Sequence, residues 1–117
     1  MSEGEPESVG PEDMKIITLA RAARVRVAAA EGAAVRDETG RTYAAAAIAL
    51  PSLQLSALQL AVAMAVSSGA ASLEAAALVT DRGAVDPADL AAVREIGPDA
   101  VVIRAAADGT VLATVLP

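Results

Sequence analysis

From Thr42 to Leu73 the chain carries no charged side chain, so this stretch must be buried either in a protein interior or in a membrane. Pro51, Gly69 and several serines and glutamines interrupt it, and much of its apolar content is alanine. These residues disfavour a continuous membrane helix. The sequence therefore predicts a buried strand followed by a central, buried helix, and it predicts no contact with a membrane.

The hydrophobic core must be built from small aliphatic side chains, because the chain has one tyrosine and no phenylalanine or tryptophan. A length of 117 residues is typical of a single domain. Burial of alanine removes little apolar area from water, and each Å² of apolar area that is buried stabilises the folded state by about 25 cal/mol. We therefore expect some valine, leucine and isoleucine faces to be covered by a partner, and hence a homo-oligomer.

The net charge of −6 lies largely near the N-terminus. An acidic chain lacks the basic surface that nucleic acids require, so the sequence predicts no nucleic-acid partner. Residues 1–10 contain little apolar mass and are predicted to form a disordered acidic tail, followed by one domain over residues 11–117. The chain has no cysteine, and its start lacks a basic region followed by an apolar run; both features favour a cytoplasmic location.

Hydrophobic periodicity and turn residues predict three helices and five strands in the order α-β-β-α-β-α-β-β. The expected helices are 12–29, 52–66 with Ser52 as its N-cap, and 87–96 with Asp86 as its N-cap. The expected strands are 33–36, 41–47, 75–79, 100–104 and 110–115. Two strand–helix–strand connections joined to hairpins predict an α/β fold with a mixed five-stranded sheet and helices on its faces.

Several short motifs occur together in an order and spacing that carry a family resemblance. They are Gly32-Ala33-Ala34-Val35 with Asp37-x-x-Gly40-Arg41-x-Tyr43, Ala65-Val66-Ser67-Ser68-Gly69, Val79-Thr80-Asp81, Val85-Asp86-Pro87, Val101-Val102-Ile103, Asp108-Gly109 and Leu116-Pro117. Over residues 12–117 the chain thereby resembles the small cytidine deaminases. The resemblance implies a three-layer α-β-α sandwich and assembly into a dimer or tetramer.

In that family the chemistry lies at the starts of the second and third helices, where His or Cys side chains hold a zinc ion and a Glu transfers protons. This chain has neither histidine nor cysteine. The resemblance places the first ligand position on Ser56, the proton-transferring Glu on Leu58, and the two remaining ligands on Ala88 and Ala91. It therefore implies degenerate catalytic positions, no metal and no cofactor.

The resemblance also implies where a nucleoside would be bound. The Asn and Glu that hold the ribose fall on Ala47 and Ala49, and an aromatic residue that lines the base pocket falls near Ala29. These three positions mark a vestigial pocket. Glu31 and Glu74 are expected to lie too far from the two helix starts to replace the missing Glu.

Other charged residues allow two interpretations. Asp81, Asp86 and Asp89 could supply oxygen ligands to a cation, or they could occupy a turn, an N-cap and a helix N-terminus. A set of arginines could bind an anion if they converge, or they could be separate solvated charges; they are Arg36, Arg41, Arg82 and Arg104.

The retained scaffold and the replaced positions predict that the chain is not an enzyme. The leading hypothesis is a catalytically inactive cytidine deaminase-like protein that acts as an oligomeric interaction or scaffold protein, alone or with an active paralogue. One alternative is a protein that binds a nucleoside, a nucleotide or another small molecule in the vestigial pocket. A second alternative is a related hydrolase with a non-standard site.

Overall fold

The computed structural model describes residues 9–117. The predicted acidic tail therefore lies outside the described residues, apart from its last two. Gly10 is the N-cap of the first helix, and Pro11 occupies the first helical turn, where its missing N–H costs nothing. The first helix thus begins close to the predicted position.

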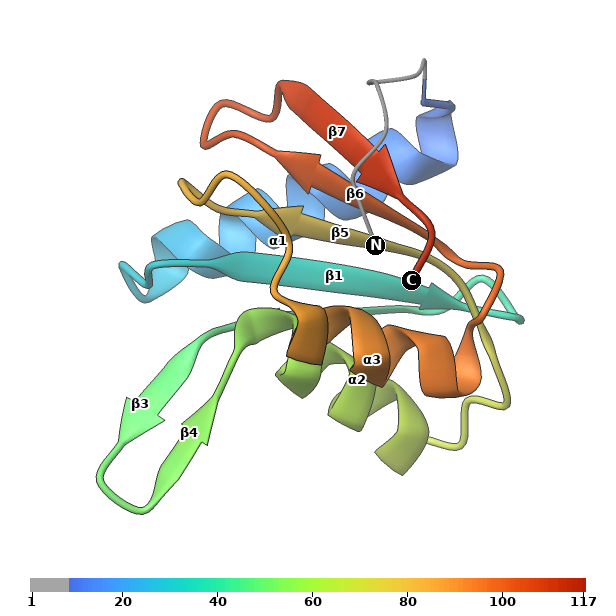
Figure 1. Cartoon of the computed structure of the whole chain (residues 1–117), viewed down its shortest axis with the longest axis horizontal. Helices are drawn as coiled ribbons and strands as arrows, with labels where there is room; N and C mark the ends of the chain where they lie inside the picture. The colour runs from blue at the N-terminus through green and yellow to red at the C-terminus, as the bar shows by residue number, and fades with distance from the viewer. Residues whose placement is uncertain (1–8) are drawn as a thin grey trace.

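A mixed five-stranded sheet forms the centre of the molecule (Figure 1). The strand order is β2 (Thr42–Ala46), β1 (Gly32–Asp37), β5 (Leu73–Val79), β6 (Val101–Ala105) and β7 (Val111–Val115). The pair β5–β6 is parallel, and all neighbouring pairs beside it are antiparallel. The parallel pair requires a crossover connection, and a helix provides it.

Helices cover both faces of this sheet, which gives three layers (Figure 1). Helix α1 (Pro11–Arg26) covers one face, and α2 (Ala57–Ser67) and α3 (Pro87–Ile96) cover the other. Each interface contains its own cluster of buried apolar side chains. The predicted α/β sandwich with a mixed five-stranded sheet is confirmed.

Small residues allow α1 to lie very close to the sheet. A Cβ atom added to Gly32 would stand 2.1 Å from the carbonyl oxygen of Ala20. Ala20 and Ala34 are both fully buried at this interface. The low aromatic content thus has a structural use, because bulkier residues here would push helix and sheet apart.

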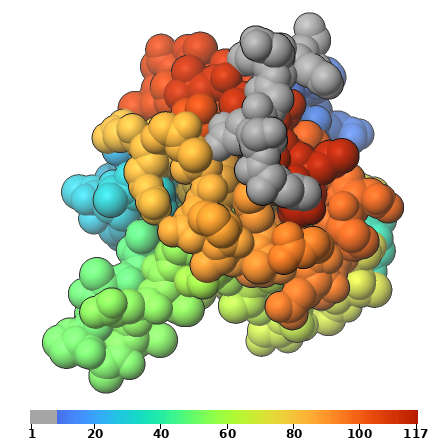
Figure 2. All heavy atoms as spheres, viewed as in Figure 1, coloured from blue at the N-terminus to red at the C-terminus, as the bar shows by residue number. Residues whose placement is uncertain are grey.

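The segment before α2 differs from the prediction. Residues expected to begin the helix form a hairpin, β3 (Ile48–Leu50) and β4 (Leu53–Leu55), with Pro51 and Ser52 as its two-residue turn. Ser52 is therefore not an N-cap, and the helix begins behind Ser56 instead. The hairpin projects from the body of the molecule as an arm (Figure 2), which we call the β3–β4 arm. The prediction failed because leucines at 50, 53 and 55 fit both a helix and a two-residue period.

Other boundaries shift by a few residues. Helix α1 ends at Arg26 rather than at residue 29, and Ala28 follows it with a positive φ of 52°. The strand expected at 75–79 begins earlier, at Leu73. Within the described residues, none of the helices has both the length and the apolar character needed to cross a membrane.

Candidate functional site

Ser56 joins the starts of two helices. As the N-cap of α2, its hydroxyl accepts a hydrogen bond from the Gln59 backbone N–H at 3.0 Å, and the Gln59 side chain accepts one from the Ser56 N–H at 3.1 Å. This capping box fixes the Ser56 side chain. Its hydroxyl donates in turn to a carboxylate oxygen of Asp89, at 2.6 Å. Asp89 lies in the first turn of α3, so one bond connects the two helix starts.

Asp89 is a buried carboxyl group, only 3 % exposed. Burial raises the pKa of Asp89 above the ordinary value. The hydrogen bond from Ser56 lowers this pKa, but its effect is smaller than that of burial. The charges of Glu31 and Asp86 raise this pKa further, and that of Arg82 lowers it. Burial is thus the largest influence on Asp89, and its pKa lies above that of an ordinary aspartate.

Glu31 and Thr80 form a second buried pair beside Asp89. The Thr80 hydroxyl donates to a carboxylate oxygen of Glu31 at 2.7 Å and accepts from the Arg82 backbone N–H at 3.1 Å. Glu31 is 8 % exposed and Thr80 is 1 % exposed. We call Glu31, Ser56, Thr80 and Asp89 the helix-start cluster. Neither carboxylate of this cluster forms an ion pair with another residue of the part described, 9–117.

Sequence reasoning missed two members of this cluster. Glu31 was expected to lie too far from the helix starts, but the chain turns directly after α1 and brings it to the sheet edge, where its charge acts on Asp89. Thr80 directly follows β5, and polar residues at the carboxyl ends of parallel strands are a recognised signal for ligand sites. That signal was present in the sequence and could have identified Thr80.

The other predicted site positions lie around the cluster. Leu58 is fully buried in the core beneath α2, whereas Ala88 is exposed and Ala91 is half-buried on α3. The Ala47 N–H donates to the Glu31 carbonyl at 3.2 Å, which places Ala47 at the cluster. Ala49 lies exposed on the β3–β4 arm.

The three vestigial pocket positions come from the connection after α1, from the residue after β2 and from β3. The Ala29 carbonyl accepts a hydrogen bond from Arg24 at 3.3 Å, in the connection after α1. Ala29 thus lies on the chain that leads to Glu31, while Ala49 lies out on the arm. The assignment of these residues to a nucleoside pocket stays a prediction.

The three aspartates do not converge on one point. The Asp81 side chain is 78 % exposed and pairs with Arg24 at 2.9 Å. Asp86 caps α3 by accepting from the Ala88 N–H at 2.9 Å, as predicted. Of the three, Asp89 alone is buried. A cation site built from these three residues has no support.

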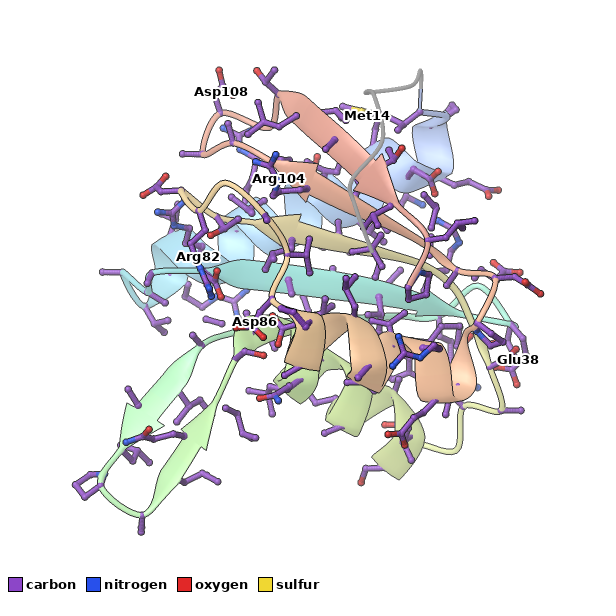
Figure 3. All side chains as sticks on the ribbon, viewed as in Figure 1. Met14, Glu38, Arg82, Asp86, Arg104 and Asp108 are labelled. Atoms are coloured by element: carbon purple, nitrogen blue, oxygen red, sulfur yellow. The ribbon has the colours of Figure 1, made fainter. Side chains whose placement is uncertain are left out.

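The arginines separate into two regions. Arg82 and Arg104 meet at the carboxyl ends of β5 and β6, where the Arg104 guanidinium donates to the Arg82 carbonyl at 3.2 Å (Figure 3). Arg36 lies elsewhere, held by Asp13 and Glu74 at 3.0 Å each. Its pKa is raised by those two partners against the opposing effect of burial. The four arginines therefore do not form one anion site.

Three helices over a mixed sheet define a layered α/β protein, and a cluster of buried polar groups lies at one edge of its sheet. The model of the cytidine deaminase-like family matches residues 9–109, so the chain belongs to this family. A comparison with curated protein sequences gave no match.

Two solved structures resemble the chain. The cytidine deaminase from Burkholderia pseudomallei is 23 % identical, with a TM-score of 0.72, over 85 % of this chain and 88 % of that one. The cytidine deaminase from Mycobacterium leprae is 19 % identical, with a TM-score of 0.65, over 90 % of this chain and 94 % of that one. These similarities establish a shared fold.

The comparisons correct the prediction that the chain is not an enzyme. The family model covers most of the chain and both similar structures are of cytidine deaminases, so these findings point to an enzyme. The prediction relied on the absence of histidine and cysteine and on the replacement of the proton-transferring Glu by Leu58. A lack of histidine and cysteine disfavours one kind of metal site, but carboxyl and hydroxyl groups also support acid–base chemistry.

The residues at the helix starts do not fit the zinc ion that the family implies. Tetrahedral zinc is held mainly by imidazole nitrogen and thiolate sulfur, and the chain contains neither. Ser56 and Asp89 offer oxygen atoms only, and no acidic group of three or more side chains suited to a metal occurs within residues 9–117.

Proposed function

We propose that this protein binds a nucleoside of the cytidine type at the helix-start cluster. The observation that carries the proposal is the 2.6 Å hydrogen bond between Ser56 and the buried Asp89, beside the buried Glu31. Two carboxylates whose partners are hydroxyl groups present hydrogen-bond acceptors without a cation to satisfy them. An exocyclic amino group is the kind of donor that suits such a site.

The position in the fold supports this proposal. The cluster lies beyond the carboxyl ends of β5 and β6, at the edge where α/β sheets commonly bind ligands. Ser56 and Asp86 are partly exposed, so the helix starts beside Asp89 reach the surface of the molecule. The amino group of cytidine would donate to the carboxylates, whereas uridine presents a carbonyl oxygen at the same place.

A thermal-shift comparison of cytidine with uridine tests this proposal. A ligand that binds the folded state raises the midpoint of unfolding. We expect cytidine to raise it and uridine to raise it less, because the uridine carbonyl faces acceptor groups. If neither nucleoside raises the midpoint at millimolar concentration, the proposal is wrong.

A second candidate function is acid–base catalysis on the same ligand. The raised pKa of Asp89 and its bond to a hydroxyl favour this candidate. In hydrolytic deamination, Asp89 would take a proton from a water that adds to the base and return it to the amino group, which leaves as ammonia. Release of ammonia from cytidine measures this reaction.

The matched variants for this assay are Asp89→Asn and Asp99→Asn. The amide in Asp89→Asn cannot transfer the proton, so the rate should fall by about two orders of magnitude or more. Asp99 is an exposed residue after α3, and its replacement should leave the rate unchanged. Equal rates in the unmodified protein, Asp89→Asn and Asp99→Asn would show that Asp89 takes no part in the reaction.

A further inference from the structure

Arg24, in the last turn of α1, contacts two segments that carry members of the helix-start cluster. Its Nε atom donates to the Ala29 carbonyl at 3.3 Å, in the connection that leads to Glu31. Its Nη2 atom donates to a carboxylate oxygen of Asp81 at 2.9 Å, and Asp81 directly follows Thr80. One guanidinium group therefore joins the chain before Glu31 to the turn after Thr80. We call this pair of bonds the Arg24 bridge.

The backbone of α1 also lies against the connection to the cluster. Gly32 directly follows Glu31, and a Cβ atom added to Gly32 would stand 2.8 Å from the Arg24 Cβ and 2.9 Å from the Arg24 backbone nitrogen. The side chain of Arg24 is 16 % exposed, so packing restricts the positions that its guanidinium group can take. The bridge is thus fixed beside the cluster by the backbone and by burial of the side chain.

Packing alone does not explain an arginine at this position. The third guanidinium nitrogen of Arg24, Nη1, is buried and has no hydrogen-bond partner among residues 9–117. A buried donor without a partner costs free energy, and an apolar side chain would fill the space without that cost. The two bonds of the bridge are therefore what distinguishes Arg24 from an apolar residue here.

The cluster depends on the relative position of the two segments that the bridge joins. The pairing of β1 with β5 ends at Gly32 and Val79, so Glu31 and Thr80 lie one residue beyond the last paired residues. At this point the β1–β5 ladder no longer holds the segments together. The Thr80–Glu31 bond of 2.7 Å and the Arg24 bridge connect them instead.

We propose that Arg24 is a positioning residue of the helix-start cluster, whose bonds to Ala29 and Asp81 hold the Glu31 and Thr80 segments at the separation that the ligand requires. Arg24 acts through these segments and does not itself touch the ligand. Its effect on ligand binding rests on the proposed function, whereas its effect on the two segments is measured without a ligand.

Hydrogen exchange of two backbone amides reports the position of the segments. The Arg82 N–H donates to the Thr80 hydroxyl at 3.1 Å, and the Ala47 N–H donates to the Glu31 carbonyl at 3.2 Å. A shift of either segment weakens one of these bonds and makes that amide exchange faster. The amide of Val35, which lies on β1 between its two partner strands, is the internal reference.

Arg24→Gln removes the charge of the bridge and cannot span both of its bonds. We expect the Arg82 and Ala47 amides to exchange at least about tenfold faster in this variant, and the Val35 amide to change by a smaller factor. Arg24→Lys keeps a charge for Asp81 but has one nitrogen, so its exchange rates should lie in between. Acceleration of all three amides by the same factor, or no change at Arg82 and Ala47, would overturn the proposal.

Arg21→Gln is the matched control on the same helix. Arg21 donates to the Ala107 carbonyl at 3.0 Å, in the turn between β6 and β7, which is not one of the two bridged segments. Its replacement should leave exchange of the Arg82 and Ala47 amides unchanged. Equal acceleration in Arg21→Gln and Arg24→Gln would show that the bridge is not the cause, and the proposal would be wrong.

Asp81→Ala tests the bridge from its other end. The Asp81 side chain is 78 % exposed, so this variant should fold even if Arg24→Gln does not. We expect faster exchange of the Arg82 amide and little change at the Ala47 amide, because the bond from Arg24 to the connection after α1 remains. An unchanged Arg82 amide in this variant would contradict the proposal.

Titration with cytidine measures the consequence for the site. We expect the affinity to be about tenfold weaker in Arg24→Gln, intermediate in Arg24→Lys and unchanged in Arg21→Gln. Equal affinities in all of these proteins would show that the bridge does not position the ligand site, and would overturn the proposal. If the unmodified protein does not bind cytidine but the two amides respond as expected, the proposed function is wrong and Arg24 still positions the two segments.

Discussion

At the scale of single residues, two buried hydroxyl–carboxylate pairs determine the chemical character of this edge of the sheet. Ser56 holds Asp89, and Thr80 holds Glu31, so two acidic groups lie inside the protein without a cationic partner among the described residues. Burial raises the pKa of Asp89, and carboxyl groups with perturbed pKa values cluster at functional sites. Ser56, to which the family resemblance assigned the first ligand position, is the N-cap of α2 in the structure.

The raised pKa of Asp89 predicts how stability depends on pH. A carboxyl group whose pKa is higher in the folded state binds its proton more tightly when folded. Its contribution is present at low pH and is lost as the pH rises from about 3.8 through the higher folded value. Urea unfolding between pH 4 and 7 should show Asp89→Asn gaining stability relative to the unmodified protein as pH increases. A constant difference across this range would show that the Asp89 pKa is not raised.

At the scale of elements, three local features set the shape of the molecule: the turn after β1, the turn of the β3–β4 arm, and the close contact between α1 and the sheet. Asp37 at the end of β1 accepts hydrogen bonds from the Thr39 N–H and hydroxyl, the Arg41 N–H and the Tyr43 hydroxyl, at 2.7 to 3.1 Å. Gly40, with a φ of +87°, completes this turn. The sequence predicted this hairpin from Asp37 and Gly40. It did not predict the β3–β4 arm, because the capping box at Ser56 and Gln59 was not recognised as the true helix start.

Asp37 should make the protein sensitive to strong acid. Hydrogen bonds, first from the Thr39 side chain and then from Tyr43 and backbone N–H groups, lower its pKa to about 2. The resulting stability is present above the ordinary pKa of 3.8 and is lost as the pH falls through about 2. Asp37→Asn should therefore lower the unfolding midpoint at pH 7 and remove much of the acid dependence between pH 4 and 2. An unchanged acid transition in that variant would mean that Asp37 is not its source.

Gly32→Ala tests the close contact between α1 and the sheet. The new Cβ would stand 2.1 Å from a backbone carbonyl oxygen, which cannot move without shifting the helix. We expect a loss of about 3 kcal/mol in the free energy of unfolding. Gly83→Ala is the matched control, because nothing lies within 4 Å of an added Cβ there, and its effect should be small. Similar losses in both variants would contradict the proposed packing.

At the scale of the whole molecule, the fold was largely predictable and the site only in part. The apolar periodicity of the sequence and the positions of proline and glycine predicted most strands and helices, because these signals act over a few residues. The meeting of Glu31 with Thr80, 49 residues apart, depends on how β1 pairs with β5, and no local pattern records that pairing. The prediction that the chain is not an enzyme was wrong, because it weighed the replaced positions Ser56, Leu58, Ala88 and Ala91 above the family match over residues 9–109.

The central claim, that the helix-start cluster binds cytidine, is tested most directly by calorimetric titration. The account predicts saturable binding with one cytidine per chain, an affinity at least about tenfold weaker in Asp89→Asn, and no change in Asp99→Asn. Binding of equal strength in all three proteins, or no binding to the unmodified protein at millimolar cytidine, would contradict it.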